Sequence, residues 1–156
     1  MLRRHEGELV SAWADEIYRE TRTELPALLS YRQLIEPIPD FLDQLGQILD
    51  QRTGSVEVSE TVRPLRFHLQ VRFQHGCLID EVARELFIFR KVLDGFLWQR
   101  GFNAGLMDMW ELRRVLSLTH SFVDEMIAQT IAVYAINLRP PINIRGLARF
   151  RFGRQS

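Results

Sequence analysis

The histidines are the first residues of this chain whose type and spacing could do chemistry. His68 and His75 lie seven residues apart, whereas two helical histidines that bind one metal ion lie three or four apart. We therefore predict no metal site here. His68 could still be an axial haem ligand if the fold is globin-like, but a hydrogen bond to a backbone carbonyl or to Glu85 is favoured. His75 precedes Gly76 and is expected to cap a helix end.

The remaining nucleophiles and His120 give little support for catalysis. His120 stands in the segment LTHSFVDE and could be a phospho-accepting histidine of a two-helix bundle. Kinases usually have an acid directly after that histidine, and Ser121 stands there instead. Cys77 has His75 two residues away but no third partner, and the chain has neither a nucleophile elbow nor a glycine-rich phosphate loop. The sequence therefore predicts that this protein is not an enzyme.

Charged residues on otherwise apolar segments form one more candidate site. Glu85 lies five residues before Arg90, a spacing that does not pair side chains well along one helix. Glu85 could instead reach Arg66 or Arg72 on the preceding helix, because a buried carboxylate requires a partner. Such a cluster could be a polar ligand pocket between two helices, or a structural ion pair, which is favoured. Its predicted members are His68, Arg66, Arg72, Glu85 and Arg90.

Helical spacing of apolar residues governs almost the whole chain, and the one strand-like segment, Ile142–Ile144, is too short to matter. The sequence predicts an all-α fold in one domain, packed as a helical bundle or in a globin-like way. Prolines and glycines divide the pattern into helices. The expected helices are Arg3–Thr23 (ended by Pro26), Ala27–Ile35, Asp40–Gln51, one from Val58 or Ser59 to Gly76, one from Ile79 to about Arg100, and Gly105–Asn137.

The two longest expected helices carry heptad-like apolar seams. The helix that starts at Ile79 is apolar on most sides, so we place it at the centre of the domain. The last helix would be roughly 50 Å long, which exceeds the diameter of a small domain. We therefore expect it to kink or to pair with a second subunit through Met109, Leu112 or Leu116. The first seam is Ile79, Val82, Leu86, Phe89, Leu93 and Phe96; the second is Met109, Leu112, Leu116, Thr119, Val123 and Met126.

Composition excludes several classes of function. The 156 residues carry a formal net charge of zero, so nucleic acid is not an expected partner. The single cysteine fits a reducing cytoplasm, and no apolar run is long enough to span a membrane. From Arg139 onward there are five arginines and no acidic residue. We expect a helical domain over residues 1–138 and an Arg-rich tail or linker over 139–156.

Several segments together resemble a known family. The stretch Arg66–Leu93 reads as helix, a break at Gly76, and a second helix with the core ELFIFR; ELVSAW at Glu8–Trp13 and TIAVY at Thr130–Tyr134 also fit. This pattern resembles the N-terminal domain of RsbR-type co-antagonists of the bacterial stress response, which also heads many bacterial sensor histidine kinases. The resemblance covers about residues 5–138. Leu86 departs from it, because the family often has tyrosine there.

The resemblance implies a non-catalytic sensory domain that dimerises and precedes a signalling output domain. We expect a cytoplasmic homodimer that couples a ligand or partner to a downstream signalling protein through its last helix, and no cofactor is expected. The alternative is a globin-like domain that binds haem or another apolar small ligand. An absorbance spectrum would separate these hypotheses, because a haem protein has an intense Soret band.

Overall fold

The computed structural model describes residues 1–51 and 57–138, and every regular element within those ranges is helical. The all-α prediction is confirmed. The predicted tail at 139–156 and the turn around Gly54 lie outside the described residues. The elements are η1 (Leu2–His5), α1 (Glu6–Arg19), α2 (Leu25–Leu28), α3 (Tyr31–Ile35), α4 (Ile38–Asp50), α5 (Val58–Val62), η2 (Arg63–Leu65), α6 (Arg66–Gln74), α7 (Ile79–Phe96), η3 (Leu97–Asn103) and α8 (Met109–Leu138).

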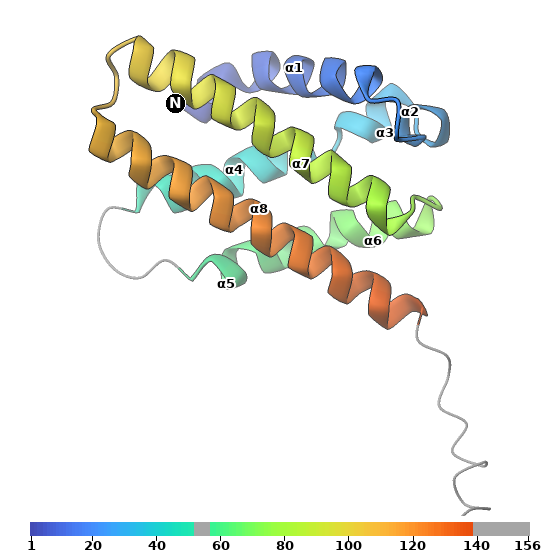
Figure 1. The fold of residues 1–156 in the computed structure, drawn as a ribbon. Helices are drawn as coiled ribbons and strands as arrows, with labels where there is room; N and C mark the ends of the chain where they lie inside the picture. Colours follow the sequence, from blue (N-terminus) through green and yellow to red (C-terminus); the bar gives the residue numbers. More distant parts are fainter. Residues whose placement is uncertain (52–56, 139–156) are drawn as a thin grey trace, which may run out of the picture.

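The two long helices α7 and α8 lie side by side and form one face of the domain (Figure 1). α1 packs along α7, while α4, α5 and α6 pack against α8. The short helices α2 and α3 connect the end of α1 to α4. Between them, α7 and α8 contact α1, α4, α5, α6 and η3, and the buried apolar core lies beneath them.

The helices before α4 are shorter than predicted, whereas α4 (Ile38–Asp50) lies close to the predicted range of Asp40–Gln51. α1 buries Leu9, Trp13 and Ile17 as expected from their spacing, but it ends at Arg19. Pro26 therefore does not terminate α1. It occupies the first turn of α2, where proline is tolerated because the first N–H groups of a helix have no partner within it.

The predicted helix from Val58 to Gly76 is interrupted at Pro64. Arg63–Leu65 form a turn of 3-10 helix between α5 and α6, which accommodates the missing N–H of the proline. The predicted end at Gly76 is confirmed, because this glycine has φ +80°, a left-handed conformation that other residues adopt at a cost. The turn brings α6 and α7 together in antiparallel fashion.

The apolar seam of α7 is buried as predicted, except at its first member. Leu86, Phe89 and the rest of the seam are at most 7% exposed, whereas Ile79 at the start of the helix is 39% exposed. The helix is not covered on every side, since Phe87 is 46% exposed. α7 ends in a π-helical segment, Leu97–Asn103, so the single helix predicted to about Arg100 changes its hydrogen-bonding pattern over the last turn.

α8 begins at Met109, four residues later than predicted, and is about 45 Å long. Its predicted seam faces the core of its own domain: Leu112 is 1% exposed, and Leu116 is half-buried and packs against the core. Leu112 is buried within its own chain, so it does not offer a surface for the predicted subunit contact. Met109, at 54% exposed, remains on the surface.

Candidate functional site: a buried ion pair between two helices

Glu85 on α7 and Arg72 on α6 form an ion pair in the interior. Nη2 of Arg72 lies 2.7 Å from Oε1 of Glu85, and Nε lies 3.1 Å from Oε2. Both residues are less than 5% exposed. The sequence offered Arg66 and Arg72 as partners for Glu85, and the structure selects Arg72. Two parallel N–H···O bonds are the strongest arrangement for a guanidinium and a carboxylate.

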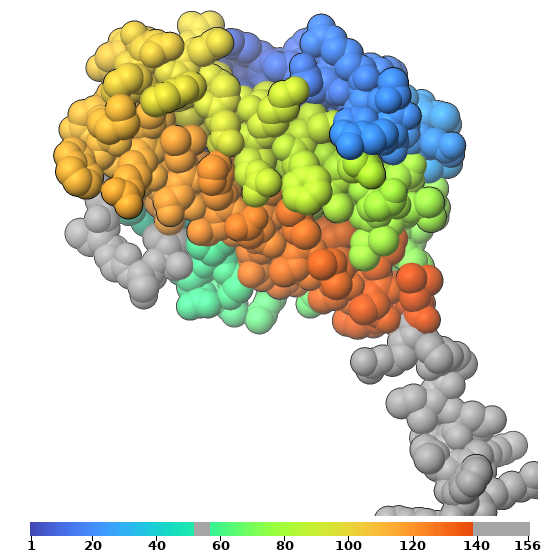
Figure 2. Space-filling model, in the orientation of Figure 1, coloured from blue at the N-terminus to red at the C-terminus, as the bar shows by residue number. Residues whose placement is uncertain are grey.

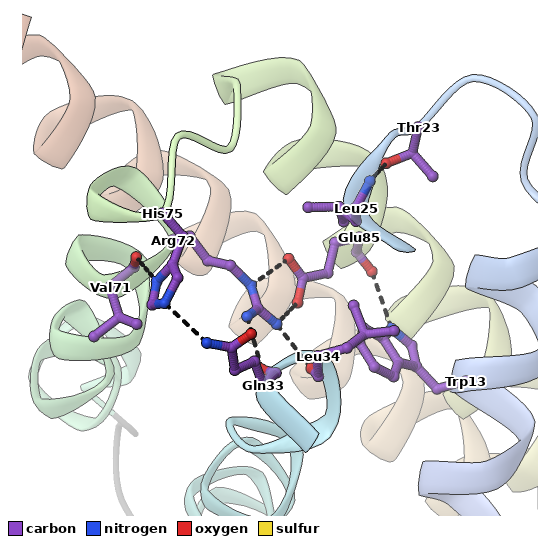
Figure 3. Close-up of polar contacts among 9 residues, drawn as sticks. All are labelled: Trp13, Thr23, Leu25, Gln33, Leu34, Val71, Arg72, His75 and Glu85. Carbon is purple, nitrogen blue, oxygen red and sulfur yellow. Dashed lines mark hydrogen bonds and ion pairs between the residues drawn. The ribbon is translucent and has the colours of Figure 1, made fainter. Parts of the chain in front are cut away.

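Arg72 also holds α3. Its Nη1 donates to the carbonyl of Gln33 at 2.9 Å, and its Nη2 donates to the carbonyl of Leu34 at 2.8 Å. Burial is the largest single influence on the pKa of Arg72 and lowers it, but the charge of Glu85 and its hydrogen bonds to the guanidinium together raise the pKa above its usual value. The guanidinium therefore stays charged and joins α3, α6 and α7 at one point (Figure 3).

The side chain of Gln33 connects α3 to the C-terminal end of α6 near the Arg72–Glu85 pair. Its side-chain amide nitrogen lies 3.2 Å from Nε2 of His75, and Nδ1 of His75 lies 2.8 Å from the carbonyl of Val71 (Figure 3). The two partners fix the tautomer, since Nδ1 must donate to the carbonyl and Nε2 must accept from the amide. His75 thus caps α6 as predicted. Gln33 also completes a capping box with Ser30 at the start of α3.

Two further buried contacts secure α7. The indole N–H of Trp13 on α1 donates to the carbonyl of Glu85 at 3.3 Å. The carboxylate of Glu81 accepts from the backbone N–H of Leu78 at 2.8 Å and of Glu24 at 2.9 Å. Neither contact was predicted from the sequence. Glu81 could have been found, because it stands three residues after the N-cap position, where a glutamate commonly reaches back to free N–H groups.

The turn between α6 and α7 is bonded to α8. The hydroxyl of Tyr134 donates to the carbonyl of Cys77, and the N–H of Cys77 donates to the carbonyl of Arg72 at 3.1 Å. Burial raises the pKa of the Cys77 thiol to about 11 and also raises the pKa of Tyr134. Both groups are therefore neutral at physiological pH, and Cys77 is a poor nucleophile.

The other predicted members of the cluster lie outside the ion pair. Arg90 binds Asp124 on α8 at 3.2 Å. Arg66 is half-buried and has no ion-pair partner among the described residues. His68 was expected to bond to a carbonyl or to Glu85, but its Nε2 lies 2.7 Å from a carboxylate oxygen of Asp40. Of the five residues predicted as one site, four thus belong to three separate pairs, Arg72–Glu85, Arg90–Asp124 and His68–Asp40, and Arg66 stands apart from all three.

The space between these groups is small. His68, Arg72 and Glu85 border one internal cavity of only about 10 Å³, which is no larger than a single water requires. In the described ranges no three His, Cys, Asp or Glu side chains gather as a metal site would need. Likewise, none of the described helices is long and apolar enough to cross a membrane. The arrangement can hold α3, α6 and α7 in one relative position, and it has no room for a bound molecule.

His120, the candidate phosphate acceptor, lies on the surface of α8. Its Nε2 is 2.9 Å from Asp94 of α7, and its side chain is 45% exposed. It belongs to a contact between α7 and α8 that is separate from the buried pair.

Comparison with known proteins supports a regulatory class. A family model described as the RsbT co-antagonist protein rsbRD N-terminal domain matches residues 7–139. Comparison with curated proteins gave no match, and comparison with solved structures gave none. The matched range spans every helix from α1 to α8 and confirms the resemblance seen in the sequence. This chain belongs to the family of RsbT co-antagonist rsbRD N-terminal domains.

Proposed function

We propose that this chain is the signal-input domain of a bacterial stress-response regulator that acts on an RsbT-type partner. The family match supports the regulatory class. The observation that carries the mechanism is the bonded path from α3 to α8. The path runs through the Arg72 guanidinium, the backbone of the α6–α7 turn at Cys77, and the hydroxyl of Tyr134.

We expect this path to couple the movements of α3, α6, α7 and α8. A shift of α6 relative to α7 must stretch or break the Arg72–Glu85 pair, because both side chains are buried and fixed by several bonds. The same shift moves the turn to which Tyr134 is bonded. A signal that favours a second arrangement of α6 and α7 would therefore displace the C-terminal part of α8, as packed helices tend to move between discrete positions.

We also propose that the domain forms a homodimer through the exposed side of α8. Ala128, Ile131, Ala135 and Leu138 are all exposed there and are spaced by three, four and three residues. This is the spacing of a coiled-coil seam, so the same stripe on a second copy is a matching partner. We propose this stripe as the interface in place of the buried Leu112. It extends to Leu138, the last residue of α8.

The substitution Tyr134→Phe tests the coupling. It removes one hydroxyl that donates to Cys77 and leaves the ring, which contacts Phe73 edge-on at 5.1 Å. In cells that carry the variant in place of the native protein, we expect transcription of stress-response genes to change at unchanged protein abundance. A matched control is Tyr18→Phe on the exposed side of α1. A response that follows protein abundance alone would contradict the proposal.

The proposal includes no catalysis and no haem, and it places the protein in the cytoplasm. Nε2 of His68 is 2.7 Å from Asp40, and the adjoining cavity of about 10 Å³ cannot admit a porphyrin. We expect the purified protein to lack a Soret band. A Soret band that disappears in His68→Ala would favour the globin-like alternative. Incubation with a phosphodonor and mass analysis of His120 tests the remaining hypothesis of phosphotransfer.

A further inference from the structure

A groove lies between the end of α1, the loop that follows it, and α7. It has a volume of about 300 Å³, which is the lower end of the range for sites that bind small molecules. The end of α1 and the loop that follows it meet α7 on the face that Figure 2 shows. The groove is lined by Glu16 and Arg19 of α1, Glu20 and Arg22 of the loop, and Arg84, Phe87, Ile88 and Lys91 of α7.

Cations outnumber anions in this groove, and both carboxylates are already engaged. Glu16 accepts from Lys91 at 3.0 Å and from Arg19 at 3.2 Å. Glu20 accepts two bonds from the side chain of Arg22, at 2.8 and 2.9 Å. The bonds from Arg22, with a smaller contribution from the charge of Arg84, lower the pKa of Glu20 to about 2. Glu20 is therefore an anion whose hydrogen bonds are made to Arg22.

Arg84 is the one cation lining the groove whose side chain makes no hydrogen bond or close ion pair with the described residues. Its Nε is buried and has no hydrogen-bond partner among the described residues, and no described carboxylate lies within ion-pair distance of its guanidinium. Buried donors in proteins nearly always have a partner, so a donor without one calls for an explanation. A guanidinium offers paired N–H groups that match the two oxygens of a carboxylate.

The wall beside Arg84 is apolar. Phe87, at 46% exposed, is the exposed aromatic side chain of α7, and the guanidinium carbon of Arg90 lies 5.5 Å from its ring centroid. Ile88 forms part of the buried floor. A ligand that fits must therefore combine one negative group with an apolar body. We propose that this groove binds a small aromatic monocarboxylate, with its carboxylate on Arg84 and its ring against Phe87.

The groove lies next to the buried ion pair in the sequence of α7, so a bound molecule could affect that pair. Arg84 directly precedes Glu85, whose carbonyl accepts from Trp13 of α1 and whose carboxylate binds Arg72. A molecule held between α1 and α7 would act on the helix pair that this bond joins. This consequence for signalling rests on the proposed function, whereas binding itself does not.

Benzoate is the probe, and binding is followed by two-dimensional NMR of the purified chain, so the result is independent of signalling. Benzyl alcohol has the same ring without the charge, and inorganic phosphate has charge without the ring. We expect saturable shifts around Arg84 and Phe87 with benzoate in the millimolar range, weaker binding of phosphate, and none of benzyl alcohol. Shifts that do not saturate, or phosphate binding as tight as benzoate, would overturn the proposal.

Variants locate the site. Arg84→Gln should weaken benzoate binding at least about tenfold, because the charged pair is lost. Arg113→Gln, an exposed arginine of α8 that does not line the groove, should leave it unchanged. Phe87→Ser should weaken benzoate but not phosphate, and its exposed side chain makes it a usable test if Arg84→Gln fails to fold. Unchanged benzoate affinity in either groove variant would refute the assignment.

Discussion

Replacing one partner of the buried ion pair is the most informative perturbation of this domain. Glu85→Met removes the carboxylate and leaves the guanidinium of Arg72 with its two carbonyl acceptors on α3. An arginine side chain cannot lose its proton in a protein, so a full charge remains at a position that is 4% exposed. The reverse change, Arg72→Met, leaves a carboxylate that can become neutral by taking up a proton.

These differences set the expected magnitudes. Breaking a buried ion pair from one side costs about 3–5 kcal/mol, which is a large part of the roughly 5–15 kcal/mol that stabilises a typical domain. We expect both single variants to lose about that much at neutral pH. Under mildly acidic conditions Arg72→Met should recover part of the loss and Glu85→Met should not. The double variant should lose less than the sum of the two single variants, because no charge is left buried.

Urea unfolding followed by circular dichroism measures these losses. Arg66→Met is the matched control, since Arg66 lies on the same helix, is half-buried and has no ion-pair partner among the described residues. It should change stability by no more than about 0.5 kcal/mol. Additive losses in the double variant, or single losses below about 1 kcal/mol, would show that the pair does not hold α6 to α7.

Three more changes test the rest of the structure. Phe89→Ala should cost about 3–5 kcal/mol in urea unfolding, because Phe89 is 2% exposed, whereas Phe87→Ala on the exposed side should cost under about 1 kcal/mol. In light scattering, Ile131→Asp should convert the proposed dimer into a folded monomer, whereas Leu112→Asp should unfold the domain. A native chain that is monomeric at high concentration would contradict the proposed dimer. Burial raises the pKa of the Cys77 thiol to about 11 in the folded protein, whereas the pKa of the unfolded thiol is near 9.0. Because only the unfolded state then loses this proton, the free energy of unfolding should fall by up to about 2–3 kcal/mol as the pH rises from about 9 to about 11. The fall should be smaller in Cys77→Ala, which has no thiol to ionise.

The sequence was sufficient to predict the fold class and the largest features of the core. The seam of α7 has a clear period, and Gly76 marked the turn between α6 and α7 where the structure has φ +80°. The first half of the chain was harder to predict. The break at Pro64 and the early end of α1 depend on local hydrogen bonding and tertiary contacts, which a hydrophobic pattern does not contain.

The ion pair was predictable in kind but only partly in its members. A carboxylate on a buried helix face demands a cation, and that argument reduced the choice to Arg66 or Arg72. The grouping of Arg90 and His68 with it failed, because helical spacing alone does not say that Asp124 and Asp40 lie closer to them. Leu112 was predicted at a dimer contact for a related reason, but it is buried in its own chain, since an apolar seam can pack against its own domain as well as against a second chain.

The contact between Arg72 and α3 has a consequence for how this domain tolerates mutation. On the α3 side, both acceptors are main-chain carbonyls, and a point mutation cannot delete a carbonyl. On the other side, one codon change removes the guanidinium or the carboxylate. The two bonds themselves do not depend on the side chains of Gln33 and Leu34, which have other roles in the capping box and in the buried core. An insertion or deletion between Ser30 and Ile35 would move the acceptors away. The contact between α3, α6 and α7 is therefore most sensitive to changes in the length of the α3 segment and to substitutions of Arg72 and Glu85.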